Sequence, residues 1–204
     1  MRTHGYQTIE LREESISERQ KIGPILSTSY DENNNLKDNK PFAGDGYYFW
    51  ENNIEAARWW GNTHIYSRKK MGYRIFKYEF EILYDGTFFD LVGNMEHIIY
   101  LGKLIDKIKI NFSRRGKDIR DWELNQYITH LRNIAKTNPS IFPYTAIRFN
   151  DYKRVKGERI NLDKRVSPSF ILRNPYYIVC FFDINKLNLQ KYTFFQQRKQ
   201  VEAN

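Results

Sequence analysis

The amino-acid sequence predicts an α+β fold, and three observations support this prediction. Segments with the two-residue alternation of β-strands outnumber helical segments, they cluster toward both ends of the chain, and the helical segments are grouped between them. The 204 residues match the length of one domain and are enough to bury a sizeable core. Aromatic residues make up 16% of the chain, which is too much apolar ring surface for a disordered protein. We therefore expect one domain over residues 1–204, with a frayed polar tail at 196–204.

The composition also narrows the functional class. Lys and Arg number 33 against 24 Asp and Glu, and the resulting charge of +9 suits either a polyanionic partner or simple solubility. Cys180 is the only cysteine, which excludes an intramolecular disulfide and a cysteine zinc cluster, and the histidines lie too far apart in the sequence to suggest a metal site. No apolar run reaches the roughly 18 residues of a membrane helix, and residues 1–10 lack the apolar stretch of a secretory signal. We expect a soluble cytoplasmic protein with no membrane partner and no metal.

The first predicted elements follow a glycine-rich turn. Residues 44–50 read as a Gly-Asp-Gly turn and a short aromatic strand. Asn52 or Asn53 then caps a helix over 54–60, because a short side-chain amide accepts hydrogen bonds from free backbone N–H groups. Gly61 is expected to end that helix in the left-handed conformation.

The clearest strand pattern covers residues 73–83, where Phe, Tyr and Ile alternate with Lys and Glu. A turn at Asp85-Gly86 predicts a hairpin-like pair with a second strand at 87–91. Apolar residues at helical spacing then predict one helix capped by Asn94 and another at about 121–136. Further strands are expected at 144–149, 168–172 and 177–182.

Three segments stand in a suggestive order. They are Thr3-His4-Gly5, the Gly-Asp-Gly-Tyr-Tyr-Phe run at 44–49, and the helix that contains two alanines and Trp59. This order resembles the His-Tyr-Glu branch of the ADP-ribosyltransferase superfamily, which includes diphtheria toxin and the poly-ADP-ribose polymerases, and it is similar to small bacterial members found among toxins and phage-defence systems. The family's second motif, Gly-x-Gly-x-Tyr-Phe, is complete here, and Trp59 falls at an aromatic position eleven residues after Tyr48. The resemblance covers residues 1–90 well and the final core strand loosely.

The resemblance implies a split β-sheet core with inserted helices and a site for NAD as co-substrate. It places His4 on a ribose hydroxyl, Gly5 at the nicotinamide carboxamide, and the rings of Tyr48 and Trp59 on either side of the nicotinamide. These residue types suit the ligand, because a stacked ring pair contributes about 1 kcal/mol beyond burial and a glycine permits close approach to the backbone.

The chain departs from the family pattern at the catalytic acid. Tyr176 stands where the family's Glu is expected before the last core strand. An acid normally stabilises the positive charge that develops on the ribose as the glycosidic bond breaks. Glu51, Asp90 and Glu158 are candidates to supply it, and we take Glu51 with Tyr48 as the catalytic pair, although Glu51 is equally well placed to favour the N-terminus of the next helix. The family branch that transfers RNA 2′-phosphates lacks this Glu, and loss of catalysis is the third explanation.

We therefore predict a mono-ADP-ribosyltransferase, a glycosyltransferase that uses NAD to modify RNA, DNA or protein. The analogy suggests a bacterial toxin or antiphage effector with a cognate antitoxin. Basic side chains are expected to form an acceptor rim: Arg114, Arg115, Lys153, Arg154 and Arg159. The alternatives are a catalytically inactive nucleic-acid-binding or nucleotide-sensing module of the same fold and, ranked last, an RNA 2′-phosphotransferase.

Overall fold

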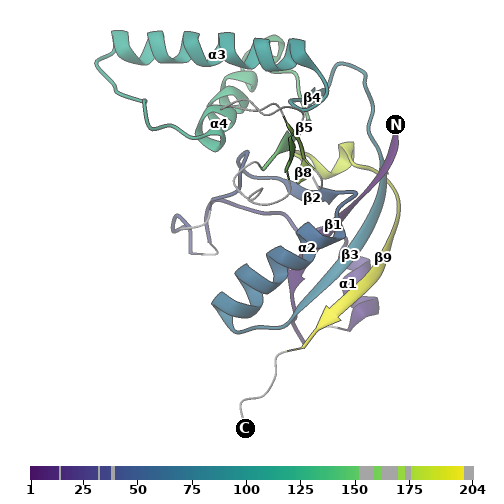
Figure 1. Ribbon diagram of the computed structural model, residues 1–204. Coiled ribbons are helices and arrows are strands. Elements are labelled where there is room, and N and C mark those ends of the chain that lie inside the picture. The colour runs from purple at the N-terminus through teal and green to yellow at the C-terminus, as the bar shows by residue number, and fades with distance from the viewer. Residues whose placement is uncertain are drawn as a thin grey trace.

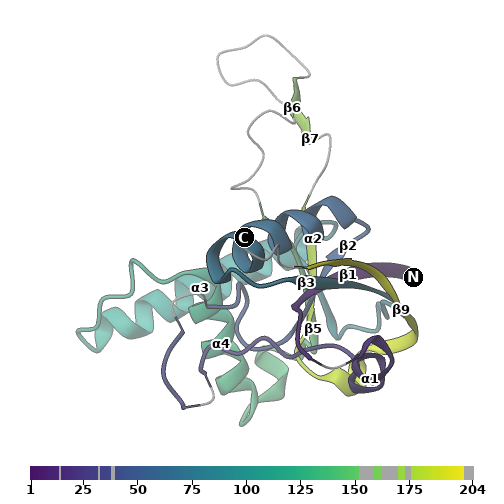
Figure 2. The same cartoon turned by 90° about the horizontal axis from the view of Figure 1, so that it is seen from below.

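A seven-stranded mixed sheet forms the centre of the molecule (Figures 1 and 2). The computed structural model describes residues 1–13, 15–31, 33–37, 40–151, 159–161, 170–172 and 176–199. The strand order in the sheet is β4-β5-β8-β2-β1-β3-β9. Its strands are β1 (Arg2–Glu10), β2 (Tyr47–Glu51), β3 (Tyr73–Glu81), β4 (Phe88–Asp90), β5 (Ala146–Asn150), β8 (Tyr177–Phe181) and β9 (Asn188–Arg198). Two further strands, β6 (Arg159–Asn161) and β7 (Phe170–Leu172), form a separate antiparallel pair.

Helices connect these strands, so the predicted α+β class is confirmed. They are α1 (Ile16–Ile22), α2 (Ile54–Trp60), α3 (Met95–Arg114) and α4 (Leu124–Ala135), with a π-helix η1 (Gly61–Ser67) and 3₁₀ turns η2 (Pro139–Ile141) and η4 (Ile184–Lys186). The side chain of Asn53 caps α2 by accepting from the N–H of Ala56 at 2.9 Å, and Asn94 caps α3. No helix in the described ranges is both long enough and apolar enough to cross a membrane.

Nearly all the sheet is antiparallel, and β1 joins its two halves. β1 pairs with β3 from Arg2 to Glu10 but with β2 only at Gly5 and Tyr6, where its partners are Glu51 and Trp50. The strands therefore form one continuous sheet, whereas the resemblance implied a split core. The short β1–β2 ladder is the narrow connection between the half that contains β3 and β9 and the half that contains β8, β5 and β4.

The predicted hairpin of the strands at 73–83 and 87–91 is wrong. Both strands exist, as β3 and β4, but β4 lies at the far edge of the sheet, where it pairs in parallel with β5. The Asp85-Gly86 turn therefore starts a crossing to the other half of the sheet. A turn signal fixes only local backbone direction, and the partner of β4 is decided by packing of Phe88 and Phe89 on opposite faces of the sheet.

Two further predictions need correction. Gly61 has φ −57°, so it is right-handed, and the chain continues into η1 instead of ending there. An added Cβ at Gly61 would lie 2.7 Å from the ring of Tyr73, which makes close packing the reason for a glycine. The tail does not fray at Gln196, because β9 continues to Arg198 and pairs there with Tyr73. Residues 200–204 lie outside the described part.

The sheet separates two apolar clusters. One face is covered by α2, α3 and α4 and includes Ala57, Leu104 and Leu131; we call it the helix-covered face. The other face, which we call the opposite face, is packed around Phe49 and Phe80 and receives Ile16 of α1. Alternation along each strand decides which of the two faces a side chain joins.

Candidate functional site

The segments that carry the family resemblance lie on neighbouring strands. Gly5 in β1 is opposite the last residue of β2, and Tyr48 in β2 is opposite Cys180 in β8. The strand order β8-β2-β1 therefore brings the His-Gly segment, the Gly-Asp-Gly-Tyr-Tyr-Phe segment and the strand that follows Tyr176 side by side (Figure 1). His4 and Gly5 lie in the middle of β1 and not at its end.

His4, Tyr48 and Tyr176 share the helix-covered face. Residues of one strand alternate between faces, and the even-numbered residues of these strands, such as Tyr6 and Trp50, belong to the apolar cluster of that face. The rings of His4 and Tyr6 meet edge to face with centroids 5.4 Å apart. Tyr176 is 9% exposed and meets Trp50 at 6.3 Å. The three motif positions thus share one face of neighbouring strands, and Tyr48 lies four residues along the strands from the level of His4 and Tyr176.

The hydroxyl of Tyr48 is held by the turn that precedes its strand. The N–H of Ala43 donates to it at 2.9 Å, and the hydroxyl donates in turn to the carbonyl of Gly44. Gly44 has φ +80°, a left-handed conformation that favours glycine. Burial raises the pKa of Tyr48 well above its usual value. The phenol is therefore a neutral group whose hydroxyl is fixed by the turn.

Side chains far along the sequence hold the same turn. Arg132 of α4 donates to the carbonyl of Asp45 at 2.7 Å, and its guanidinium lies 4.2 Å from the centre of the Phe182 ring. The carboxylate of Asp45 accepts from the N–H and the hydroxyl of Ser29 at 2.7 and 2.8 Å. Sequence reasoning missed Arg132 and Ser29, and neither has a local signal, since each acts on a turn reached only through the fold.

Gly5 serves packing on the opposite face. A Cβ there would lie 2.6 Å from the Cβ of Phe49, so any side chain would displace the central ring of that cluster. This requirement explains a glycine after His4 without a ligand, and it leaves the predicted contact of the Gly5 backbone with the carboxamide as a prediction.

Trp59 lies on α2 in an aromatic group. It contacts Trp60 and His64 with centroid distances of 6.2 and 5.1 Å, and the rings of Trp60 and His64 stack at 4.0 Å. In the ranges that the structure describes, no ring contact joins Trp59 to Tyr48. The two predicted walls of the nicotinamide site therefore come from different elements and are not packed on each other.

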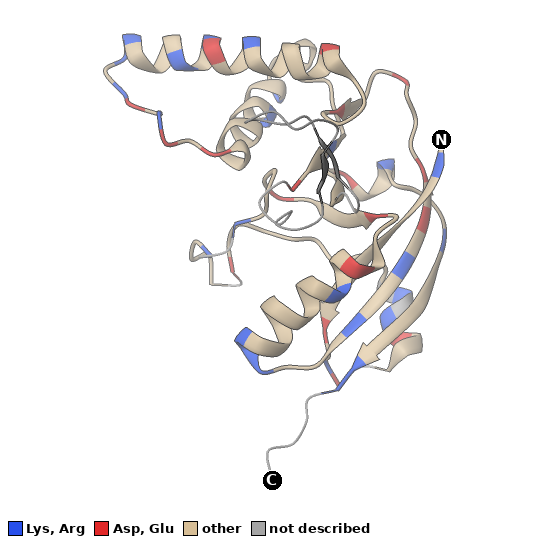
Figure 3. Cartoon of the chain, viewed as in Figure 1, with Lys and Arg blue, Asp and Glu red and all other residues tan. Residues whose placement is uncertain are grey.

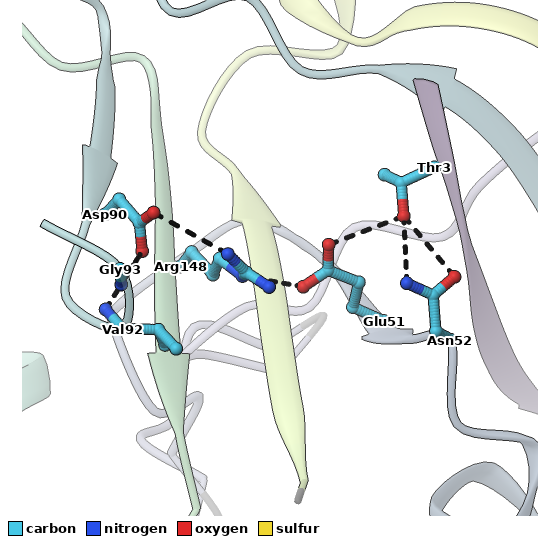
Figure 4. Close-up of polar contacts among 7 residues, drawn as sticks. All are labelled: Thr3, Glu51, Asn52, Asp90, Val92, Gly93 and Arg148. Atoms are coloured by element: carbon cyan, nitrogen blue, oxygen red, sulfur yellow. Dashed lines mark hydrogen bonds and ion pairs between the residues drawn. The ribbon is translucent and has the colours of Figure 1, made fainter. Parts of the chain in front are cut away.

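Glu51 points to the opposite face from Tyr48, because the two residues are three apart in one strand. Its carboxylate accepts a hydrogen bond from Nε of Arg148 at 2.7 Å and one from the hydroxyl of Thr3 at 3.4 Å (Figure 4). Nη1 of Arg148 lies 3.6 Å from the carboxylate of Asp90. One guanidinium of β5 thus joins carboxylates of β2 and β4.

This charged network is largely withdrawn from solvent. The side chain of Glu51 is 0% exposed and that of Arg148 is 16% exposed. Burial raises the pKa of Glu51, and the charge of Arg148 offsets part of that effect. Asp90 also accepts from the N–H groups of Val92 and Gly93, both at 2.9 Å. The oxygens of Glu51 and Asp90 are therefore committed to protein partners.

Two of the three candidate acids are brought together here, on the face away from Tyr48. Glu158 lies outside the described residues. Sequence reasoning missed Arg148, whose only signal is a cation inside an apolar strand; such a residue needs an anionic partner.

The predicted rim is described in part. Arg114 and Arg115 are exposed at the end of α3. Lys153 and Arg154 lie outside the described residues, and Arg159 lies in β6 with its side chain outside the description. Among the residues that are described, no three His, Cys, Asp or Glu side chains are grouped so as to hold a metal ion.

Comparison of the chain with protein-family models, with curated proteins and with solved structures finds no match.

Proposed function

We propose that this chain is an ADP-ribosyltransferase-fold protein that binds NAD on the helix-covered face and transfers ADP-ribose to a macromolecule. One observation carries the proposal: His4, Tyr48 and position 176, which lie far apart in the sequence, lie in or directly before three adjacent strands and on the same face. The resemblance requires this arrangement.

The side chains of this face suit the parts of NAD. Burial, with a smaller contribution from the charge of Lys77, lowers the pKa of His4. A neutral imidazole donates one N–H and accepts at its other nitrogen, which fits a ribose hydroxyl. Tyr48, with its hydroxyl fixed, contributes a ring, and Trp59 supplies the second ring from α2.

Binding without transfer is the second candidate function, and the identity of residue 176 favours it. Tyr176 is a buried neutral ring where the family has its acid. Glu51 and Asp90 face the other side of the sheet, where Arg148 holds both. A transfer reaction therefore requires Glu158 or a rearrangement that frees Glu51.

Labelled NAD separates the two functions. The purified chain is incubated with NAD labelled in the adenylate part, with and without cell extract, and nicotinamide release and macromolecular label are measured. Transfer predicts both signals, and a variant His4→Ala should lose them. NAD binding with neither signal would leave only the binding function, and absence of binding would reject both.

The acceptor and the biological role are also proposals. Loss of label after treatment with RNase or DNase would identify a nucleic-acid acceptor, and loss after protease would identify a protein. A toxin or antiphage effector should arrest bacterial growth when expressed, and His4→Ala should relieve the arrest. An antitoxin would be sought as a co-expressed protein that prevents both the arrest and the labelling.

A further inference from the structure

Residues 103–117, which run from the middle of α3 through the turn after it, carry a concentrated positive charge, and two of the cations, Arg114 and Arg115, belong to the predicted rim. Residues 103–117 contain six cations against the single acid Asp106, a net +5 of the chain's +9. The six are Lys103, Lys107, Lys109, Arg114, Arg115 and Lys117, and all are exposed (Figure 3). In the part of the chain that the structure describes, none of their side chains forms an ion pair. Arg148, Arg58 and Lys69, by contrast, are each paired with a carboxylate.

Three of these cations form a row along the helix. Lys103, Lys107 and Arg114 are four and seven residues apart, which places them on one side of an α-helix with 3.6 residues per turn. At 1.5 Å per residue the row is about 16 Å long. A row of unpaired charges matches a linear series of phosphates better than it matches a compact anion.

An aromatic group lies beside the turn that ends α3, on the side of the helix that faces α4 and about half a turn around the helix from the row. Phe112 contacts Trp122 and His130 with centroid distances of 4.9 and 5.3 Å, and Trp122 and His130 are 5.7 Å apart. All three side chains are half-buried. Arg115 lies close enough that its charge, together with burial, lowers the pKa of His130, which favours the uncharged ring. These partly exposed rings therefore lie near Arg115, at the end of the row, and rings beside cations are a combination that holds unpaired bases.

We infer that residues 103–117, which run from the middle of α3 through the turn after it, bind single-stranded nucleic acid. The backbone follows Lys103, Lys107 and Arg114 and crosses the end of the helix past Arg115, and bases reach the Phe112–Trp122–His130 group. If the chain is the proposed transferase, this nucleic acid is its acceptor, and that role rests on the proposed function. The binding itself needs no NAD. Among the exposed apolar residues of α3, Met95, Ile98 and Ile99 lie at its other end, whereas Ile110 lies within the row, between Lys107 and Arg114.

The test measures binding of a fluorescent 16-nucleotide single strand, as RNA and as DNA, by anisotropy at several salt concentrations without NAD. The variant Lys103→Gln/Lys107→Gln/Arg114→Gln should bind at least tenfold more weakly near 0.1 M salt. The slope of log affinity against log salt should fall in magnitude by about 2, because each lost phosphate contact contributes about 0.7 for single strands. Circular dichroism and thermal melting check that the fold is retained.

A matched control loses the same three charges elsewhere. Lys21→Gln/Lys191→Gln/Lys199→Gln changes exposed cations of α1, of β9 and of the residue that follows β9, elements that lie away from α3 (Figure 1). This control should keep at least half of the wild-type affinity and the wild-type salt slope. Equal losses in both variants would reduce the effect to net charge and overturn the inference. An unchanged α3 variant would overturn it as well.

Two further arms identify the ligand class. A duplex of the same length should bind more weakly than the single strand, because its bases are not free to stack. A duplex that binds equally well, or anionic phospholipid vesicles that bind more tightly than either nucleic acid, would contradict the inference. A wild-type chain that binds NAD but no nucleic acid would reject this surface and leave the proposed function standing. A wild-type chain that binds nucleic acid but no NAD would reject the proposed function alone.

Discussion

At the scale of single residues, the hydroxyl of Tyr48 holds the turn that precedes its strand. Tyr48→Phe leaves the N–H of Ala43 and the carbonyl of Gly44 without this partner. Loss of a partner by a buried polar group costs about 1–3 kcal/mol. Urea unfolding should show a decrease of this size in the free energy of unfolding of Tyr48→Phe. The control is Tyr47→Phe, because the hydroxyl of Tyr47 forms no hydrogen bond among the described residues, and it should change that free energy by less than about 0.5 kcal/mol. Equal stability of the two variants would contradict the proposed role.

Glu51 gives a pH-dependent prediction. Its pKa is raised in the folded protein, so over the interval between the unfolded and folded pKa values the folded state holds a proton that the unfolded chain has lost. The contribution of Glu51 to stability is therefore present at low pH and decreases as pH rises through the folded pKa. The unfolding free energy of the wild type minus that of Glu51→Gln should fall as pH rises above about 4, the ordinary pKa of a glutamate. Subtraction cancels the other titrating groups, and a difference that rises with pH would show that Arg148 outweighs burial.

At the scale of elements, α4 and β2 meet at the Gly44–Asp45 turn. Arg132 from α4 and Tyr48 from β2 hold neighbouring carbonyls of that turn. Residues that support one turn are coupled. The loss in the free energy of unfolding in the Arg132→Gln/Tyr48→Phe double variant should therefore differ from the sum of the two single losses by more than about 0.5 kcal/mol. Arg120→Gln, an exposed residue paired with Asp118, should be additive with Tyr48→Phe. Additivity in both double variants would mean that α4 does not support the motif turn.

Elements with a strong period could be predicted from the sequence, and elements decided by tertiary pairing could not. The strand β3 and the helices α3 and α4 follow clear apolar patterns and were predicted. β9 was missed because it is an edge strand, half-exposed along most of its length, so its residues do not alternate. α1 was missed as well, although Ser15 and Glu18 form a capping box that is a recognisable signal.

At the scale of the whole molecule, the sheet separates two sets of functional candidates. His4, Tyr48 and Trp59 belong to the helix-covered side, while Glu51 and Asp90 meet on the opposite face. The motif order could be predicted because it is local in sequence. The grouping of Glu51 with Arg148 could not, because it depends on the strand order that places β5 two strands from β2. The same separation makes Tyr84 a suitable control for the NAD site. Its side chain is 59% exposed, and burial, together with the charge of Asp90 on the opposite face, raises its pKa.

Direct measurement of NAD binding by isothermal titration calorimetry tests the central claim most directly. The wild-type chain and Tyr84→Ala should bind NAD with the same Kd, because Tyr84 is on the opposite side of the sheet from His4. Trp59→Ala should weaken binding by about fivefold to tenfold, since a stacked ring contributes about 1 kcal/mol beyond burial. Absence of binding to the folded wild-type chain at millimolar NAD, or an equal loss in Tyr84→Ala and Trp59→Ala, would contradict an NAD site on the helix-covered face.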